Sequence, residues 1–132
     1  MSSDVLIRCL AVAAGGSLGS LGRYGLSLWG ATLNARIPFG TLAANALGCL
    51  AMGAVMQVVI VRASLPETWR LFLAVGLLGG LTTFSTFSYE SVTLARQGHT
   101  GSAVLYVVGS LVIGLAGALL GWWLASLVPT RA

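Results

Sequence analysis

The chain has 132 residues, of which 57% are hydrophobic and only 8% are charged, and its seven basic and three acidic side chains give a net charge of +4. Soluble domains carry about 25% charged residues, which keep their surfaces hydrated. So few charges exclude a water-soluble enzyme, a disordered chain and a disulfide-rich secreted scaffold, and they favour a small integral membrane protein.

Four apolar stretches are long enough to cross a bilayer, which requires about 20 mostly apolar residues in a helix. In chain order they cover about 5–29, 37–61, 69–95 and 102–128, and short polar connectors at 34–38, 62–67 and 96–101 separate them. We therefore predict an all-α integral membrane protein with one four-helix transmembrane domain over residues 1–132. Small residues four apart, such as Gly15 and Gly19, favour close helix packing and self-association.

The charges do not indicate a nucleic-acid partner, because the basic residues are scattered arginines without a basic patch. Four spans place both chain ends on one side of the membrane, and the arginines are too evenly divided to set an orientation. The balance is either chance in a small count or a sign of dual topology, in which molecules insert both ways and pair antiparallel. The chain-end side holds Arg8, Arg62, Arg70 and Arg131, and the other holds Arg36 and Arg96, with Arg23 near it.

The third stretch contains an unusual run of glycine and threonine. Gly79-Gly80 and Thr82-Thr83 both weaken a helix, which indicates a break near the middle of this span. Backbone carbonyls freed at such a break can bind a cation, and freed amides can bind an anion. The alternative is a continuous helix whose glycines pack against a neighbour and whose hydroxyls bond to the preceding turn.

Polar and aromatic side chains follow this run at helical spacing. Phe84 and Phe87 lie on one helix face, and the positive edges of their rings could contact a small anion, although two core phenylalanines would give the same pattern. Glu90, within the apolar sequence, is either a functional group or an interfacial one. Hydroxyls and an amide on three spans suit a hydrated path for an anion that accepts hydrogen bonds. These side chains are Thr41, Asn45, Thr83, Ser85, Thr86, Tyr106 and Ser110.

The segment Gly79-Gly-Leu-Thr-Thr-Phe-Ser-Thr-Phe87 closely resembles the signature of the Fluc fluoride channels, a family also called CrcB. Gly22-Arg-Tyr24 and Gly40-Thr-Leu-Ala-Ala-Asn45 resemble further motifs of that family, and the likeness spans the whole chain. The resemblance implies an antiparallel, dual-topology homodimer with two pores. It also implies passive, fluoride-selective conduction across the bacterial plasma (inner) membrane, which exports fluoride and protects the cell.

The resemblance also implies roles for individual residues. Phe84 and Phe87 match the aromatic box that contacts fluoride, and Asn45 matches a pore-lining donor. A structural sodium ion at the dimer interface is implied, held by the backbone carbonyls of Gly79 and Thr82 from both subunits. Where some relatives carry another serine on the fourth span, this chain has Gly114. The remaining matches are the broken-helix and polar-track residues Thr82, Thr83, Ser85 and Thr86, the fourth-span residues Tyr106 and Ser110, and the vestibule residue Arg23.

Two other functions remain open from the residues alone. A small multidrug-type, proton-coupled exporter would need a carboxylate within its first span, but this stretch has no acid after Asp4. A non-transporting membrane subunit would have no need of the polar residues on three spans. We expect no enzymatic activity, because the sequence contains no evident nucleophile–base pair or metal cluster.

Overall fold

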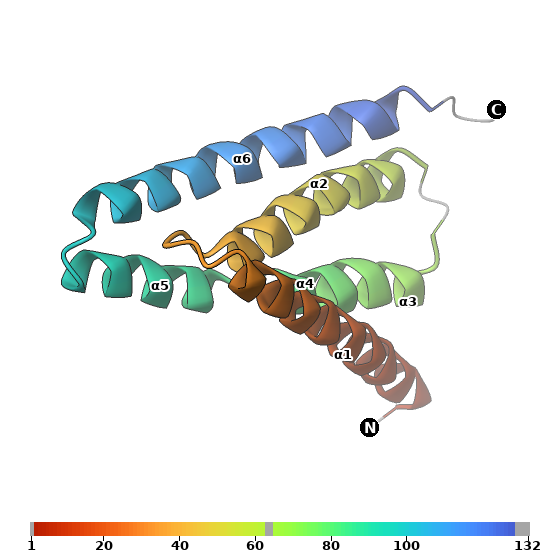
Figure 1. Cartoon of the computed structure of the whole chain (residues 1–132). Coiled ribbons are helices and arrows are strands. Elements are labelled where there is room, and N and C mark those ends of the chain that lie inside the picture. Colours follow the sequence, from red (N-terminus) through yellow and green to blue (C-terminus); the bar gives the residue numbers. More distant parts are fainter. Residues whose placement is uncertain (1, 63–64, 129–132) are drawn as a thin grey trace.

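The computed structural model describes residues 2–62 and 65–128, and its elements are helices joined by short connections (Figure 1). Within these residues, four helices long and apolar enough to cross a membrane confirm the predicted all-helical, four-span architecture: Ser3–Thr32, Phe39–Val59, Glu67–Arg96 and Thr100–Ser126. Residues 63–64 of the second connector, and Arg131 of the charge comparison, lie outside the described residues. The elements are α1 (Ser3–Thr32), α2 (Phe39–Arg62), α3 (Glu67–Arg70), η1 (Leu71–Leu78), α4 (Gly79–Leu81), α5 (Phe84–Arg96) and α6 (Thr100–Ser126).

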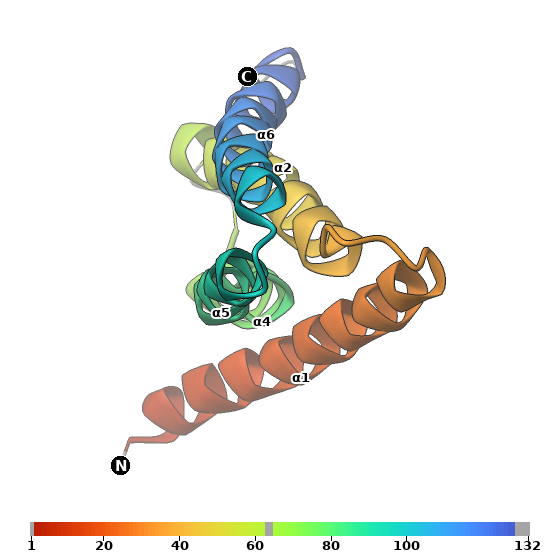
Figure 2. The ribbon, with the colours of Figure 1, turned by 60° about the vertical axis from the view of Figure 1, so that its left-hand side comes forward.

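The helices pack mainly as two pairs. α6 lies along α2, and α1 crosses the segment formed by η1 and α4 (Figures 1 and 2). Glycines allow both contacts, since a Cβ at Gly19 would collide with the backbone of Leu77, and one at Gly121 would collide with that of Leu50. Helices in lipid associate through such close backbone packing, because water does not drive apolar surfaces together there.

The third apolar stretch is not a uniform α-helix. η1 is wound as a π-helix, and the N–H of Gly79 at its end points back five residues to the carbonyl of Ala74. Short π-helical segments within α-helices are often found at functional sites in proteins. The sequence contained no signal for this winding, because its apolar residues are compatible with either helix type.

The turn between α5 and α6 fixes the position of these two helices. Gly98 adopts φ +82°, the left-handed conformation that glycine reaches without strain. The N–H of His99 bonds to the carbonyl of Leu94 at 3.0 Å, which closes the end of α5 as in a Schellman motif. Leu94, Ala103 and Tyr106 then form a buried cluster between the two helices.

Candidate functional site

Two threonines connect α4 to α5 through extended backbone. Thr82 has φ −83° and ψ 155°, and Thr83 has φ −152° and ψ 122°. The hydroxyl of Thr82 donates to the carbonyl of Leu78 at 3.0 Å. The Oγ1 of Thr83 accepts the N–H of Thr86 at 3.2 Å, as an N-cap residue does. Side-chain hydrogen bonds therefore stabilise the end of one helix and the start of the next.

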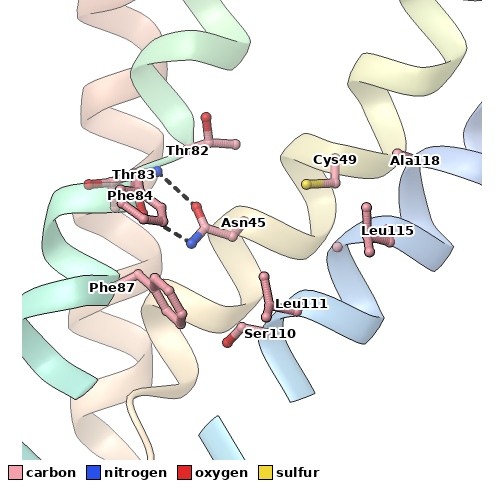
Figure 3. Close-up of a pocket in the computed structure, with 11 residues that line it drawn as sticks. Asn45, Cys49, Thr82, Thr83, Phe84, Phe87, Ser110, Leu111, Leu115 and Ala118 are labelled. Atoms are coloured by element: carbon pink, nitrogen blue, oxygen red, sulfur yellow. Dashed lines mark hydrogen bonds between the residues drawn. The ribbon is translucent and has the colours of Figure 1, made fainter. Parts of the chain in front are cut away.

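Asn45 of α2 holds this extended segment in place. Its Oδ1 accepts the N–H of Thr83 at 2.8 Å, and its Nδ2 donates to the carbonyl oxygen of Thr83 at 3.1 Å (Figure 3). An asparagine amide carries two N–H groups. One of them is used by Thr83, and the second remains available to a hydrogen-bond acceptor.

A cavity of about 350 Å³ lies beside Asn45, between α2, α5 and α6 (Figure 3). Its polar groups are few, and one of them, the Oγ of Ser110, is buried without a hydrogen-bond partner. Buried hydroxyls normally have partners, so an unpaired one marks a place where a ligand or water fits. The lining residues are Asn45, Cys49, Thr82, Thr83, Phe84, Phe87, Ser110, Leu111, Gly114, Leu115 and Ala118.

The two phenylalanines stand at this cavity in different surroundings. Their ring centroids are 5.9 Å apart, with the ring planes at 46°. Phe84 is 79% exposed, the largest fraction among the exposed large hydrophobic side chains of the described residues. Phe87 packs instead against the ring of Tyr106, with a centroid distance of 5.3 Å. The ring of Phe87 is thus packed against a residue of the same chain, whereas most of the Phe84 ring is uncovered.

Glu90 accepts hydrogen bonds from two of the predicted polar residues, one of which, Tyr106, packs against the cavity residue Phe87. The hydroxyl of Thr41 donates to its Oε1 at 2.9 Å, and that of Tyr106 donates to its Oε2 at 2.7 Å. The two donors are almost completely buried. Three helices, α2, α5 and α6, therefore meet at one carboxylate. Sequence reasoning singled out all three residues but did not connect them, because they are far apart in the chain.

Three other predicted residues, Ser85, Thr86 and Arg23, do not line the cavity. The hydroxyl of Thr86 accepts a hydrogen bond from that of Thr83 at 3.1 Å, and Ser85 is exposed. Arg23 of α1 donates from its Nε to the carbonyl oxygen of Gly80 at 3.2 Å. This arginine therefore contacts the backbone just before the extended threonines.

The carbonyl groups of Gly79 and Thr82 have lost their usual helical partners. The N–H of Thr83, which would bond to Gly79 in a continuous helix, goes to Asn45 instead. The N–H of Thr86, which would bond to Thr82, goes to the Thr83 side chain. Carbonyl oxygens without donors are suitable ligands for a hard cation. Among residues 2–62 and 65–128, no three His, Cys, Asp or Glu side chains form a metal-binding group.

Comparison with known proteins shows the family to which the chain belongs. The family described as "CrcB-like protein, Camphor Resistance (CrcB)" matches residues 10–122. The chain belongs to the CrcB family. The resemblance of its glycine–threonine–phenylalanine segment to that family is thereby confirmed.

Similar CrcB proteins cover nearly the whole chain. A protein of Thermus thermophilus is 50% identical over 116 residues, which are 87% of this chain and 91% of the relative. One from a Roseiflexus species is 43% identical over 121 residues, 91% of this chain and 98% of the relative. One from Acidobacterium capsulatum is 40% identical over 126 residues, 95% and 98% of the two chains. All three are named "Fluoride-specific ion channel FluC", which describes channels and not enzymes.

Proposed function

We propose that this chain forms a passive, fluoride-specific channel that exports fluoride from the bacterial cytoplasm across the plasma (inner) membrane. The observation that carries the proposal is the cavity beside Asn45, in which hydrogen-bond donors and aromatic rings meet in otherwise apolar surroundings. The names of the CrcB relatives support the same conclusion. Hydrogen fluoride enters cells as a neutral molecule and ionises in the more alkaline cytoplasm, so a negative membrane potential drives the trapped anion out through a channel.

The cavity offers fluoride partial charges without a full counter-charge. The second N–H of Asn45 and the hydroxyl of Ser110 can donate hydrogen bonds to the ion. The edges of Phe84 and Phe87 carry partial positive charge and can approach it from the other side. Conduction requires binding that is strong enough to admit an ion and weak enough to release it, and such a neutral lining meets both conditions.

We propose further that two copies pair in antiparallel orientation and that Thr82 and Thr83 break the third span at membrane depth. Lipid cannot satisfy extended backbone, which is tolerated at that depth only where protein or water covers it. Gly79, Phe84 and Ser85 are exposed in the single chain, next to the extended pair. A second copy on this face would cover them and would complete the surroundings of the free ring of Phe84.

A structural sodium ion fits the same face. The carbonyl oxygens of Gly79 and Thr82 lack their helical donors, and two copies would together provide four such ligands. When bound, the ion would supply a positive charge that fixes the two extended segments against each other. The hydroxyl of Thr82 also donates to the carbonyl oxygen of Leu78 at 3.0 Å, and this hydrogen bond restricts the backbone conformations that Thr82 can adopt.

The two alternative functions are weaker. A proton-coupled exporter needs a carboxylate within its first span. The candidate first span of this chain, Ser3–Thr32, has Asp4 in its first turn and no later acid. A non-transporting subunit would not explain the unpaired hydroxyl in the cavity.

The proposal is tested by loading liposomes that contain the purified protein with potassium fluoride and adding valinomycin. A fluoride electrode should record fast fluoride efflux. Vesicles loaded with potassium chloride, followed with a chloride electrode, should show no chloride efflux. Ser110→Ala should slow fluoride efflux, whereas Ser126→Ala should not, because the Ser126 hydroxyl bonds to Trp123 outside the cavity. Folded, dimeric protein without fluoride efflux would reject the channel and favour a non-transporting subunit.

A further inference from the structure

Two smaller cavities lie on the other side of Glu90 from the main one. Their volumes are about 270 and 180 Å³. Arg36, Pro38 and Glu90 line both of them. Arg36 belongs to the connection between α1 and α2, so this hollow region is the end of the bundle formed by the first and third connections.

A row of side chains on α2 and just before it leads from the main cavity to this end. Asn45 lines the main cavity, Thr41 bonds to Glu90 one turn earlier, and Arg36 lies just before the helix begins. Phe87 and Tyr106, in ring contact, connect the same two places from the side of α5 and α6. An anion that leaves the main cavity in this direction therefore passes Glu90 and then meets Arg36.

The carboxylate of Glu90 poses an electrostatic problem for that anion. Its two oxygens accept hydrogen bonds from Thr41 and Tyr106, but neither donor carries a positive charge. Within the described part of the chain, the ion pairs closer than 4.0 Å join Glu67 to Arg8 and Arg70. The guanidinium of Arg36 is therefore not paired with an acid there and can act on a passing ion.

We propose that Arg36 is an anion-concentrating residue at this mouth of the pathway, which offsets the negative charge of Glu90 and raises the local concentration of small hard anions. This inference rests on the proposed channel function. A positive charge at the entrance of a narrow path attracts counter-ions and raises the rate at which they enter, and dissolved salt screens that attraction. Arg36 is a steering residue here and need not touch the ion inside the cavity.

Arg36→Gln tests the proposal, and Arg96→Gln is the matched control. Arg96 ends α5 at the same end of the bundle, is exposed, and lines none of the three cavities described above. Both variants lose one positive charge. Fluoride efflux is measured at an ionic strength of about 20 mM and again with an impermeant salt at about 300 mM. Arg36→Gln should lower the rate about two- to five-fold at low salt and much less at high salt, while Arg36→Lys should match the unaltered protein and Arg96→Gln, whose charge lies outside the cavities, should lower the rate less than Arg36→Gln does.

The outcomes separate the inference from the function on which it rests. Equal rates for Arg36→Gln and the unaltered protein at low salt would overturn the steering role and leave the channel intact. A loss that is the same at both salt concentrations, or that Arg36→Lys shares, would also overturn it, because the side chain would then act through structure. Unaltered protein that conducts no fluoride would reject the proposed function, and the inference would fail with it.

Discussion

Replacing Asn45 by aspartate alters the charge and the hydrogen-bond donors of the cavity while keeping its shape. Asparagine and aspartate have nearly the same shape, but an ionised aspartate can only accept hydrogen bonds. The N–H of Thr83, now 2.8 Å from Oδ1, would keep its acceptor. The carbonyl of Thr83, now 3.1 Å from Nδ2, would lose its donor and face a carboxylate oxygen. The cavity would lose the free N–H and gain a negative charge.

The size of the effect follows from the same geometry. An ion that accepts a hydrogen bond from Nδ2 lies about 3 Å from it, so a carboxylate would place its charge about 4 Å from fluoride. At an effective dielectric constant of about 20, the repulsion is about 4 kcal/mol. Since about 1.4 kcal/mol corresponds to a factor of ten, we expect Asn45→Asp to slow fluoride efflux about a thousand-fold.

The liposome efflux assay measures this loss, and two variants control it. Asn34→Asp makes the same chemical change outside the main cavity, in the exposed segment two residues before Arg36, so it should slow efflux no more than the roughly two- to five-fold expected from loss of the Arg36 charge. Asn45→Ala removes both hydrogen bonds to Thr83 without adding charge, so it should conduct faster than Asn45→Asp and lower stability by about 2 kcal/mol. Folded Asn45→Asp that conducts within ten-fold of the unaltered protein would show that Asn45 does not face the ion.

Three further predictions follow from contacts around the cavity and between the helices. Phe84→Ala should slow efflux at least ten-fold, whereas the single chain should change in stability by less than about 1 kcal/mol because the ring is 79% exposed in it; stability is measured by thermal unfolding in detergent at a dilution at which the protein is monomeric. Gly121→Ala should lower that stability by about 1–3 kcal/mol, because its Cβ would collide with the backbone of α2, and Gly101→Ala, with open space around it, should not. A small thiol-reactive reagent should block efflux in the unaltered protein and in Cys9→Ala but not in Cys49→Ala, because only Cys49 lines the cavity; equal block of both variants would contradict this placement.

The sequence was sufficient to predict the four helices and several of the polar and aromatic side chains that the structure gathers at the candidate site. Apolar stretches of about 20 residues and more leave few structures other than spanning helices, and the polar residues stand out against them. The partners of these residues could not be predicted. Asn45 bonds to a backbone 38 residues further along the chain, and nothing in either segment specifies that distance.

Glu90 illustrates a signal that was present and incomplete. Its place in the sequence, six residues before Arg96, was equally compatible with an interfacial position. An antiparallel pairing of α2 with α5 that brings Asn45 to Thr83 also brings Thr41 towards Glu90. That relation becomes visible only when one of the two contacts is known, because helix crossing angles set it and spacing along one helix does not.

The pairing of the helices constrains how the chain assembles as it is synthesised. The first helix packs against the third apolar segment, and α2 packs against α6, so the partners alternate along the chain instead of following one another. When only α1 and α2 have been synthesised, each of the two helix pairs therefore has one member and lacks the other. α2 has no partner until the final helix is made, and a chain that ends after α5 would leave the face of α2 that α6 covers open to lipid or to another protein. Until the last span is inserted, the uncovered face of α2 would therefore be accessible to the cellular factors that recognise incompletely assembled membrane proteins.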